Sequence, residues 1–193
     1  MGTPMSVAEY LELELPEPED KRTIELDDGK LYIAEFAWVS HQLVLGQLLF
    51  RLCLYLDGFA EPPAEVWQRD ILVLSRDLQR IMMADLTVTL QGHEHPIVDG
   101  CVEVEPDVVV EIISDDSRHR DLVWKRQVYA EAGIPEYWIC DGRNDTVRQL
   151  ELRDGQYVER AILTADDTLT TPLLPGLAVP LADVFRHRSR PAR

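Results

Sequence analysis

The stretch that decides the fold is "PDVVVEIIS", residues 106–114, because it is almost continuously aliphatic and yet contains Glu111. A Val- and Ile-rich run of this kind is typical of a strand buried on both faces, in the interior of a sheet. A helical pattern follows over about residues 118–132, and a second strand-like run, "PEYWICD", occupies residues 135–141. The order strand, helix, strand predicts a βαβ crossover, and therefore an α/β fold with a mixed β-sheet core flanked by helices.

Further elements are predicted on both sides of this unit. Two β-hairpins, at 22–36 and around 146–163, each contain an Asp-Gly turn between β-rich runs. The other predicted elements are a helix opened by a Ser6–Glu9 capping box, strands within 65–75 and 80–90, and a stretch over 170–185 that is extended and then helical. Asp115, Asp116 and Ser117 are available as N-caps of the 118–132 helix, and Gly133 stands at its C′ position.

The longest predicted helix runs from Trp38 to Leu56 and ends at Asp57-Gly58. Its apolar side chains cover more than one face of the helix; they are Leu43, Val44, Leu45, Leu48, Leu49, Phe50, Leu52 and Leu54. The helix is therefore either central to the core or partly buried against a second chain, and a homodimer stays open as one of the two interpretations.

The composition indicates one globular domain over residues 1–193, with a core over about 6–185 and a basic tail at 186–193. The N-terminus lacks the pattern of a signal peptide, and no stretch is expected to be long and apolar enough to cross a membrane. We therefore expect a cytoplasmic protein with no membrane partner. The three cysteines lack metal-site or disulfide spacing and are interpreted as reduced thiols.

The formal net charge of −16 argues against a generally basic surface of the kind that binds nucleic acid non-specifically. A polyanion would have to bind at a local basic patch. The densest such cluster in the core is Arg118, His119, Arg120 and Arg126.

Glu111 is the first chemical anomaly, because an ionised carboxylate in an apolar strand costs several kcal/mol unless a cation pairs with it. Strand alternation places Asp107, Val109, Glu111 and Ile113 on one face. Asp107 is an unsuitable partner, since four residues separate the two Cα atoms by roughly 13 Å, too far for both carboxylates to chelate one ion.

Asp85 is a better partner for Glu111, because it is the single charge in "IMMADLTVTL" and is expected in the middle of a strand. If that strand lies beside the Glu111 strand, at about 4.8 Å, the two carboxylates can converge on one ion. Two carboxylates with carbonyl and water oxygens form the hard ligand set that Mg²⁺ or Mn²⁺ prefers. Alternatively, Asp85 ends a strand and faces water.

Lys125 is the second anomaly, because it falls inside the apolar arc of its helix. That arc is formed by Leu122, Trp124, Val128, Tyr129 and Ala132. A solvated lysine should lie opposite such an arc, although a lysine at its edge can extend its ammonium group to water.

These segments resemble a known family. "PDVVVEIIS" followed by "RDLVWKRQVYAEAGIPEYWICD", with "IELDDGKLY" upstream and "PGLAVPLADVF" downstream, is similar to the Uma-two type of restriction endonuclease, a bacterial branch of the PD-(D/E)XK nuclease superfamily. The resemblance runs from about Ser6 to Phe185. It implies a restriction-endonuclease-like fold and Mg²⁺-dependent hydrolysis of DNA phosphodiester bonds.

By position, the resemblance implies that Asp85 and Glu111 are the metal ligands. Glu111-Ile112-Ile113 places isoleucine where the superfamily has lysine, and Lys125 on the following helix is the match. Ala84 stands where the family usually has proline. Glu25 and His41 also match family positions, as secondary site residues, although a hairpin charge facing water and a structural histidine explain them equally.

The expected function is thus a Mg²⁺- or Mn²⁺-dependent endonuclease in which Asp85, Glu111 and Lys125 are catalytic. Arg118, Arg120 and Arg126 would hold flanking phosphates of the DNA. The acidic composition keeps a second class open, a non-catalytic or partner-dependent protein that retains the nuclease fold and binds nucleic acid or protein. Hydrolysis of a smaller phosphate ester is a third alternative.

Overall fold

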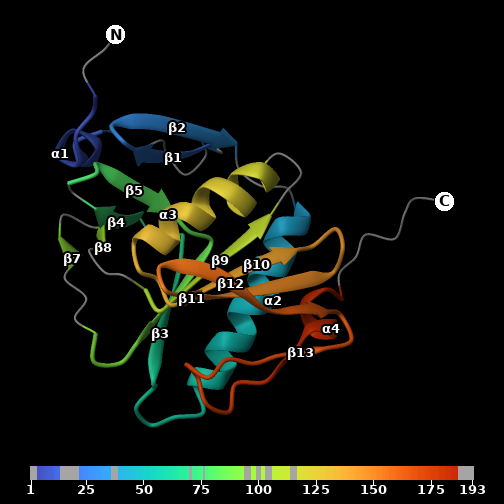
Figure 1. The fold of residues 1–193 in the computed structure, drawn as a ribbon. Helices are drawn as coiled ribbons and strands as arrows, with labels where there is room; N and C mark the ends of the chain where they lie inside the picture. The colour runs from blue at the N-terminus through green and yellow to red at the C-terminus, as the bar shows by residue number, and fades with distance from the viewer. Residues whose placement is uncertain are drawn as a thin grey trace.

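The computed structural model describes residues 4–13, 22–35, 39–69, 71–75, 77–93, 97–98, 101–102, 106–113 and 117–186. Trp38, the predicted caps Asp115 and Asp116, and the tail from residue 187 lie outside these residues. Two six-stranded sheets and their helices form the fold (Figure 1).

The first sheet, the central sheet, has the strand order β12-β11-β10-β9-β6-β3. Its strands are β3 (Ala64–Gln68), β6 (Leu86–Leu90), β9 (Val108–Ile113), β10 (Glu136–Asp141), β11 (Thr146–Arg153) and β12 (Gln156–Thr164). β9 and β10 are parallel and the other neighbours are antiparallel. All six residues of β9 are buried, so the predicted mixed sheet with an interior aliphatic strand is confirmed.

The second sheet, the hairpin sheet, has the order β2-β1-β5-β4-β8-β7. Its strands are β1 (Arg22–Asp27), β2 (Lys30–Glu35), β4 (Ile71–Ser75), β5 (Arg80–Met83), β7 (Ile97–Val98) and β8 (Cys101–Val102). A further pair is formed by β13 (Thr168–Leu169) and β14 (Val179–Pro180). Both predicted hairpins are present, and positive φ angles at Asp28-Gly29 and Asp154-Gly155 match the two-residue turns that join twisted strands.

The strands predicted within 65–75 and 80–90 are each divided between the two sheets, which corrects the placement of Asp85 in the middle of a strand. The first run turns at Arg69, whose φ is 57°, and the second turns at Ala84-Asp85. The two turns meet, because the Arg69 N–H donates to the Asp85 carbonyl at 3.1 Å. Asp85 therefore lies where the chain leaves the hairpin sheet and enters the central sheet.

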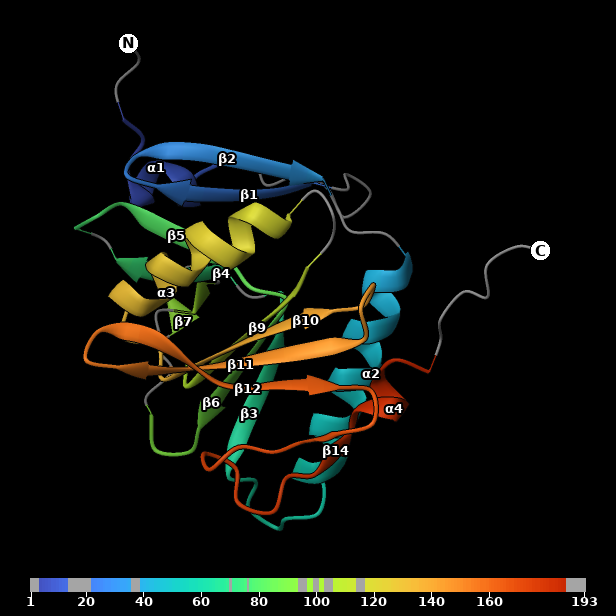
Figure 2. The same cartoon turned by 45° about the vertical axis from the view of Figure 1, so that its right-hand side comes forward.

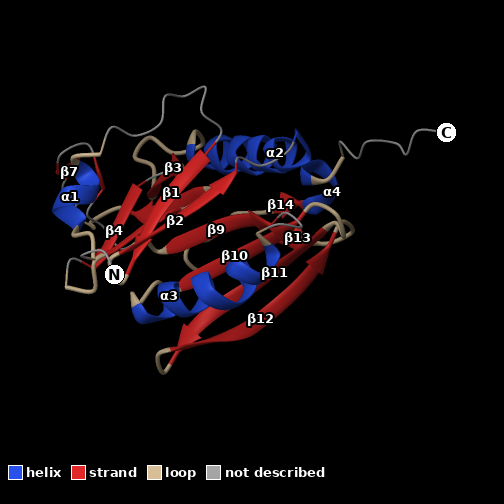
Figure 3. Ribbon diagram, turned by 90° about the horizontal axis from the view of Figure 1, so that it is seen from above, coloured by secondary structure: helices blue, strands red, loops and turns tan. Residues whose placement is uncertain are grey.

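Helices cover both faces of the central sheet, as Figures 2 and 3 show. These helices are α2 (Val39–Leu56), a π-helical segment η1 (Arg120–Lys125), α3 (Arg126–Glu131) and α4 (Leu181–Val184). A further helix, α1 (Val7–Leu11), packs against the hairpin sheet instead. α2 and α4 share one core with alternate β9 residues, and α3 shares another core with the intervening β9 residues and part of the hairpin sheet. The Ser6–Glu9 capping box of α1 is confirmed.

The 118–132 region is not the regular α-helix that was predicted. Its first part, η1, is a π-helix, in which hydrogen bonds join residues five apart and widen the turn. Ala132 is the C-cap of α3, and Gly133 follows with a φ of 82°, as predicted for its C′ position. The wider turn changes which side chains of η1 share a face.

α2 corrects one expectation, because it is 18 residues long with a mean hydropathy of 1.3 and could span a membrane by length and composition alone. Its inward side is nevertheless packed into the core of the central sheet, through Val44, Leu45, Leu48, Leu52 and Leu56. That packing is the behaviour expected of a core helix.

Candidate active site

The Lys125 ammonium group lies in a buried cluster of carboxylates. Its Nζ donates to Glu111 Oε1 at 2.6 Å and to the Met83 carbonyl at 3.0 Å. Nζ also lies 3.1 Å from Glu25 Oε1 and 3.9 Å from Asp121 Oδ1. The Lys125 side chain is only 5% exposed. The lysine is therefore buried in the apolar arc of its helix, and its ammonium group does not extend to water.

Glu111 projects from the middle of β9 toward α3. Val109 and Ile113 are on the same side in the α3 core, whereas Val110 and Ile112 pack on the α2 side, as strand alternation predicts. The Tyr129 hydroxyl donates to Glu111 Oε1 at 2.7 Å. The helical region thus presents two donors, four residues apart, to one oxygen of Glu111.

Glu25 connects the hairpin sheet to the cluster. It stands in β1, is buried, and accepts a hydrogen bond from the Met83 backbone N–H at 3.0 Å through Oε1. Its other oxygen, Oε2, forms an ion pair with Arg120 of η1. The alternative of a hairpin charge facing water is therefore wrong for Glu25.

Asp85 is held beside Glu111 by the start of β6. The pairing of Leu86 with Val110 aligns β6 with β9. Asp85 Oδ2 accepts a hydrogen bond from the Ile112 backbone N–H at 2.8 Å and lies 2.9 Å from His41 Nε2 on α2. His41 reaches the site from the opposite face of the sheet, and its role in the structure is to hold this carboxylate.

Burial and the neighbouring negative charges favour the protonated form of Glu111. Burial raises the pKa of Glu111 to about 8, Lys125 opposes that rise, and the negative charges of Asp121 and Asp85 add to it. Burial likewise raises the pKa of Asp121, and Lys125 again opposes the shift. Lys125 therefore lowers the pKa of both Glu111 and Asp121, while burial and the neighbouring negative charges raise it.

This pKa shift predicts a stability difference between the wild type and Glu111→Gln. Because folding raises the pKa of Glu111 from 4.5 to about 8, folded chains bind more protons than unfolded chains within that interval. The contribution of Glu111 to the unfolding free energy is complete below pH 4.5 and is lost as the pH rises through about 8. Urea unfolding across this range should show a smaller decline for Glu111→Gln, and identical pH profiles would contradict the shift.

Sequence reasoning missed two members of the cluster, Asp121 and Tyr129. Asp121 is buried on η1, four residues before Lys125. The i,i+4 spacing of acid and lysine was a usable signal, because residues so spaced share a helix face. Tyr129 looked like an ordinary core aromatic, and its hydroxyl partner becomes evident only once β9 packs against α3.

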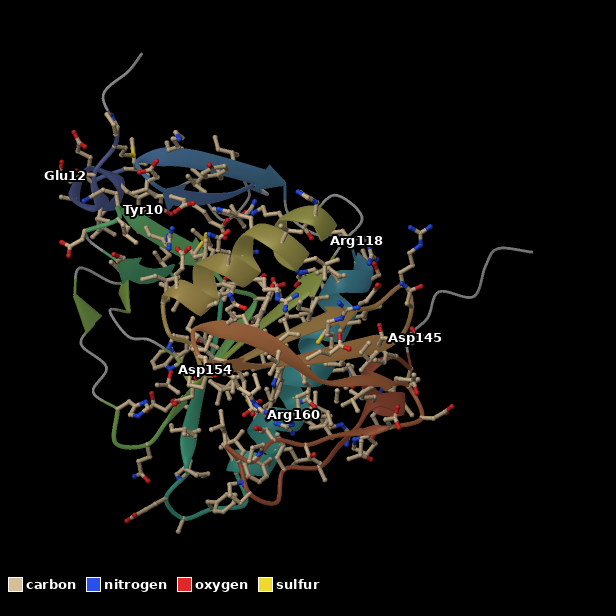
Figure 4. The ribbon with its side chains drawn as sticks, in the orientation of Figure 1. Tyr10, Glu12, Arg118, Asp145, Asp154 and Arg160 are labelled. Atoms are coloured by element: carbon tan, nitrogen blue, oxygen red, sulfur yellow. The ribbon has the colours of Figure 1, made fainter. Side chains whose placement is uncertain are left out.

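The expectation that Arg118, Arg120 and Arg126 form one phosphate-binding patch is not supported by their contacts. Arg118 Nη2 donates to Asp141 Oδ2 at 2.8 Å, and Figure 4 shows where its side chain lies. Arg126 Nη2 donates to the Tyr157 carbonyl at 2.6 Å, and Arg120 points inward to Glu25. The sequence cluster is divided because the helical turn directs the three side chains to different neighbours.

Asp107 immediately precedes β9 and lies away from the Lys125 cluster, as the distance argument predicts. Its Oδ2 accepts a hydrogen bond from the Leu90 N–H at 2.7 Å and lies 3.0 Å from His93 Nδ1. It secures the neighbouring strand and takes no part in the Lys125 cluster.

The donor set of the cluster fits a hard cation. The hydrogen bonds described above use Oδ2 of Asp85 and Oε1 of Glu111, which leaves Oδ1 and Oε2 as the oxygens that could face an ion. Carboxylate oxygens are the ligands that Mg²⁺ and Mn²⁺ prefer. Within the described part of the chain, no group of three or more His, Cys, Asp and Glu side chains is arranged as a preformed metal site.

Comparisons with known proteins agree on the fold. The model of the Uma2 family, described as "Putative restriction endonuclease", matches residues 7–182. A crystal structure described as a putative nuclease belonging to DUF820 from Anabaena variabilis ATCC 29413 superposes with a TM-score of 0.75 at 16% identity, covering 95% of this chain and 98% of that one.

A second solved structure, the type IIG restriction endonuclease BpuSI, matches with a TM-score of 0.42 at 13% identity, over 77% of this chain and 15% of its own. No curated protein matches the chain.

Proposed function

Because the chain belongs to the Uma2 family of restriction-endonuclease-like proteins, we propose that it is a Mg²⁺- or Mn²⁺-dependent endonuclease that hydrolyses DNA phosphodiester bonds. The observation that carries the proposal is the buried cluster in which Lys125 contacts Glu111 while Asp85 is fixed on the adjoining strand. Lys125 lies within 4 Å of three buried carboxylates, those of Glu25, Glu111 and Asp121. Packing of the core alone does not require such a cluster, because burying charged groups costs free energy.

Asp85 and Glu111 would hold the metal ion. When bound, the ion would lower the pKa of a water molecule and stabilise negative charge on the phosphate in the transition state. Lys125 would orient that water or neutralise the scissile phosphate. Tyr129 and Arg120 would act indirectly, because they fix Glu111 and Glu25, the two carboxylates that position the Lys125 ammonium group.

His41 would act as a positioning residue for Asp85. Its ring and the Ile112 N–H both contact Oδ2, so the other carboxylate oxygen has a defined direction. Residues that orient metal ligands typically change affinity or activity by about 10- to 100-fold when they are removed.

The alternative function, a non-catalytic protein that binds nucleic acid or a partner protein, is favoured by two observations. The Lys125 ammonium group pairs directly with Glu111 at 2.6 Å, as in a structural ion pair, and the net charge of −16 opposes the approach of DNA. Both functions use the same fold, so the chemistry of the isolated protein must decide between them.

We expect the wild-type protein to cleave supercoiled plasmid in Mg²⁺ or Mn²⁺ and to lose that activity in EDTA. A gel assay with the two metals, with Ca²⁺ and with chelator measures this directly. Because Ca²⁺ accepts a looser geometry than Mg²⁺, it is expected to permit DNA binding with little cleavage. Binding to DNA with no cleavage in any metal would support the non-catalytic alternative and overturn the proposal.

A further inference from the structure

The outward side of α2 is an apolar stripe, which we define as Val39, Leu43, Phe50 and Leu54. These side chains are 74%, 37%, 54% and 53% exposed, respectively. Gly46 lies exposed on the same side, and an added Cβ there would meet no atom within 4 Å. Contiguous exposed apolar residues on a helix mark a surface that contacts another molecule.

The stripe is also uncharged, in a chain whose charged residues make up 28% of the sequence. Arg51 is the one charged residue of α2, and its guanidinium group pairs with Asp183 at 2.8 Å. Two copies with a net charge of −16 each repel one another, so their contact is favoured at a surface that carries no acidic group.

The spacing of the stripe is symmetric about the point between Gly46 and Gln47. Val39 and Leu54 lie equally far from that point, and so do Leu43 and Phe50. We propose that two copies of the chain pair through α2 in antiparallel orientation, about a two-fold axis at this point. Phe50 would pack on the partner's Leu43, and Val39 on the partner's Leu54, as a self-complementary interface requires.

Gly46 of each copy lies beside the centre of this interface and, because it lacks a side chain, would allow the two helices to approach closely. His41 and the rest of the candidate site lie on the inward side of α2, so pairing leaves the site uncovered. A single helix pair buries less surface than the roughly 800 Å² per partner of a standard interface, and we therefore expect a dissociation constant of about 1–100 μM.

Sedimentation equilibrium of the full chain tests the dimer. Phe50→Glu should raise the dissociation constant at least about 30-fold, because it replaces the largest apolar contact with a charge. Gly46→Met should also abolish the dimer while it raises the melting temperature of the monomer, since methionine fits the open space and favours helix over glycine. Ile162→Glu is the matched control, because Ile162 is 51% exposed on β12, and it should leave the dimer unchanged.

Cross-linking tests the orientation. The position symmetric to Cys53 is Ser40, and both are exposed. With Cys101 replaced by Ser, Ser40→Cys should yield cross-linked dimers with a short bis-maleimide, whereas native Cys53 alone should not.

Three results would overturn the proposal. They are a wild type that stays monomeric up to about 1 mM, interface variants that remain dimeric, and flotation of the monomer with phosphatidylcholine vesicles.

Discussion

Replacing Glu111 with glutamine is expected to lower the rate of metal-dependent DNA cleavage at least about 1,000-fold. The change removes an anionic metal ligand, and metal stabilisation of the transition state contributes several kcal/mol. The fold should tolerate it, because the raised pKa of about 8 means that the protonated carboxyl, which glutamine resembles, is already well accommodated. The side-chain oxygen of the introduced glutamine would still accept hydrogen bonds from Lys125 and Tyr129.

Glu136→Gln is the matched control for this variant. Glu136 is also a buried glutamate, on the neighbouring strand β10, and its carboxylate is bound by Trp138, Arg160 and Thr171. These contacts lie on the other face of the sheet, so the control should lose stability and keep its cleavage rate. Equal rates for Glu111→Gln and wild type would remove Glu111 from the mechanism.

Lys125→Met is expected to lower the unfolding free energy by about 3–5 kcal/mol at pH values above 8, the range usual when one partner of a buried ion pair is removed. Methionine fills a similar volume, so the loss reports the charge and not a cavity. Glu111 would then be left without its cation, while Glu25 would keep Arg120. Urea unfolding measures the loss, and cleavage should fall together with it.

A double-mutant cycle separates the charge effect from other consequences of this substitution. The combination Lys125→Met with Glu111→Gln should recover part of the lost stability, because neither buried charge is then unpaired. The same combination should not recover cleavage. Strictly additive losses of stability would show that the two side chains are not coupled in the folded protein.

Much of the fold could be predicted from the sequence because its signals are local. A continuous aliphatic run around Glu111 is incompatible with a solvent-facing strand, and the Asp-Gly turns define both hairpins. The anomalies at Glu111 and Lys125 were visible because buried charges are costly and both fall on apolar faces. Their contact at 2.6 Å follows from the crossover that packs the helix on its preceding strand.

Other features depend on long-range contacts that leave no periodic signal. The chain passes between the two sheets at Asp85, where the Arg69 N–H donates to the Asp85 carbonyl. The sequence does not mark this turn, because the residues on either side of it have the composition of one continuous strand. The π-helix could not be read from a pattern that assumes 3.6 residues per turn. Arg118, Arg120 and Arg126 are close in sequence, which suggested one basic patch. Each of these side chains instead contacts a different neighbouring element of the fold.

A titration of Mn²⁺ into the wild type and into Asp85→Asn and Glu111→Gln, followed by calorimetry, tests the central claim most directly. Asp107→Asn serves as the control, because Asp107 is a buried aspartate that immediately precedes β9 but binds Leu90 and His93. We predict saturable binding by the wild type and the control, and at least about 10-fold weaker binding by each site variant. Absence of Mn²⁺ binding by the wild type, or equal affinity in all four proteins, would contradict a metal site at Asp85 and Glu111.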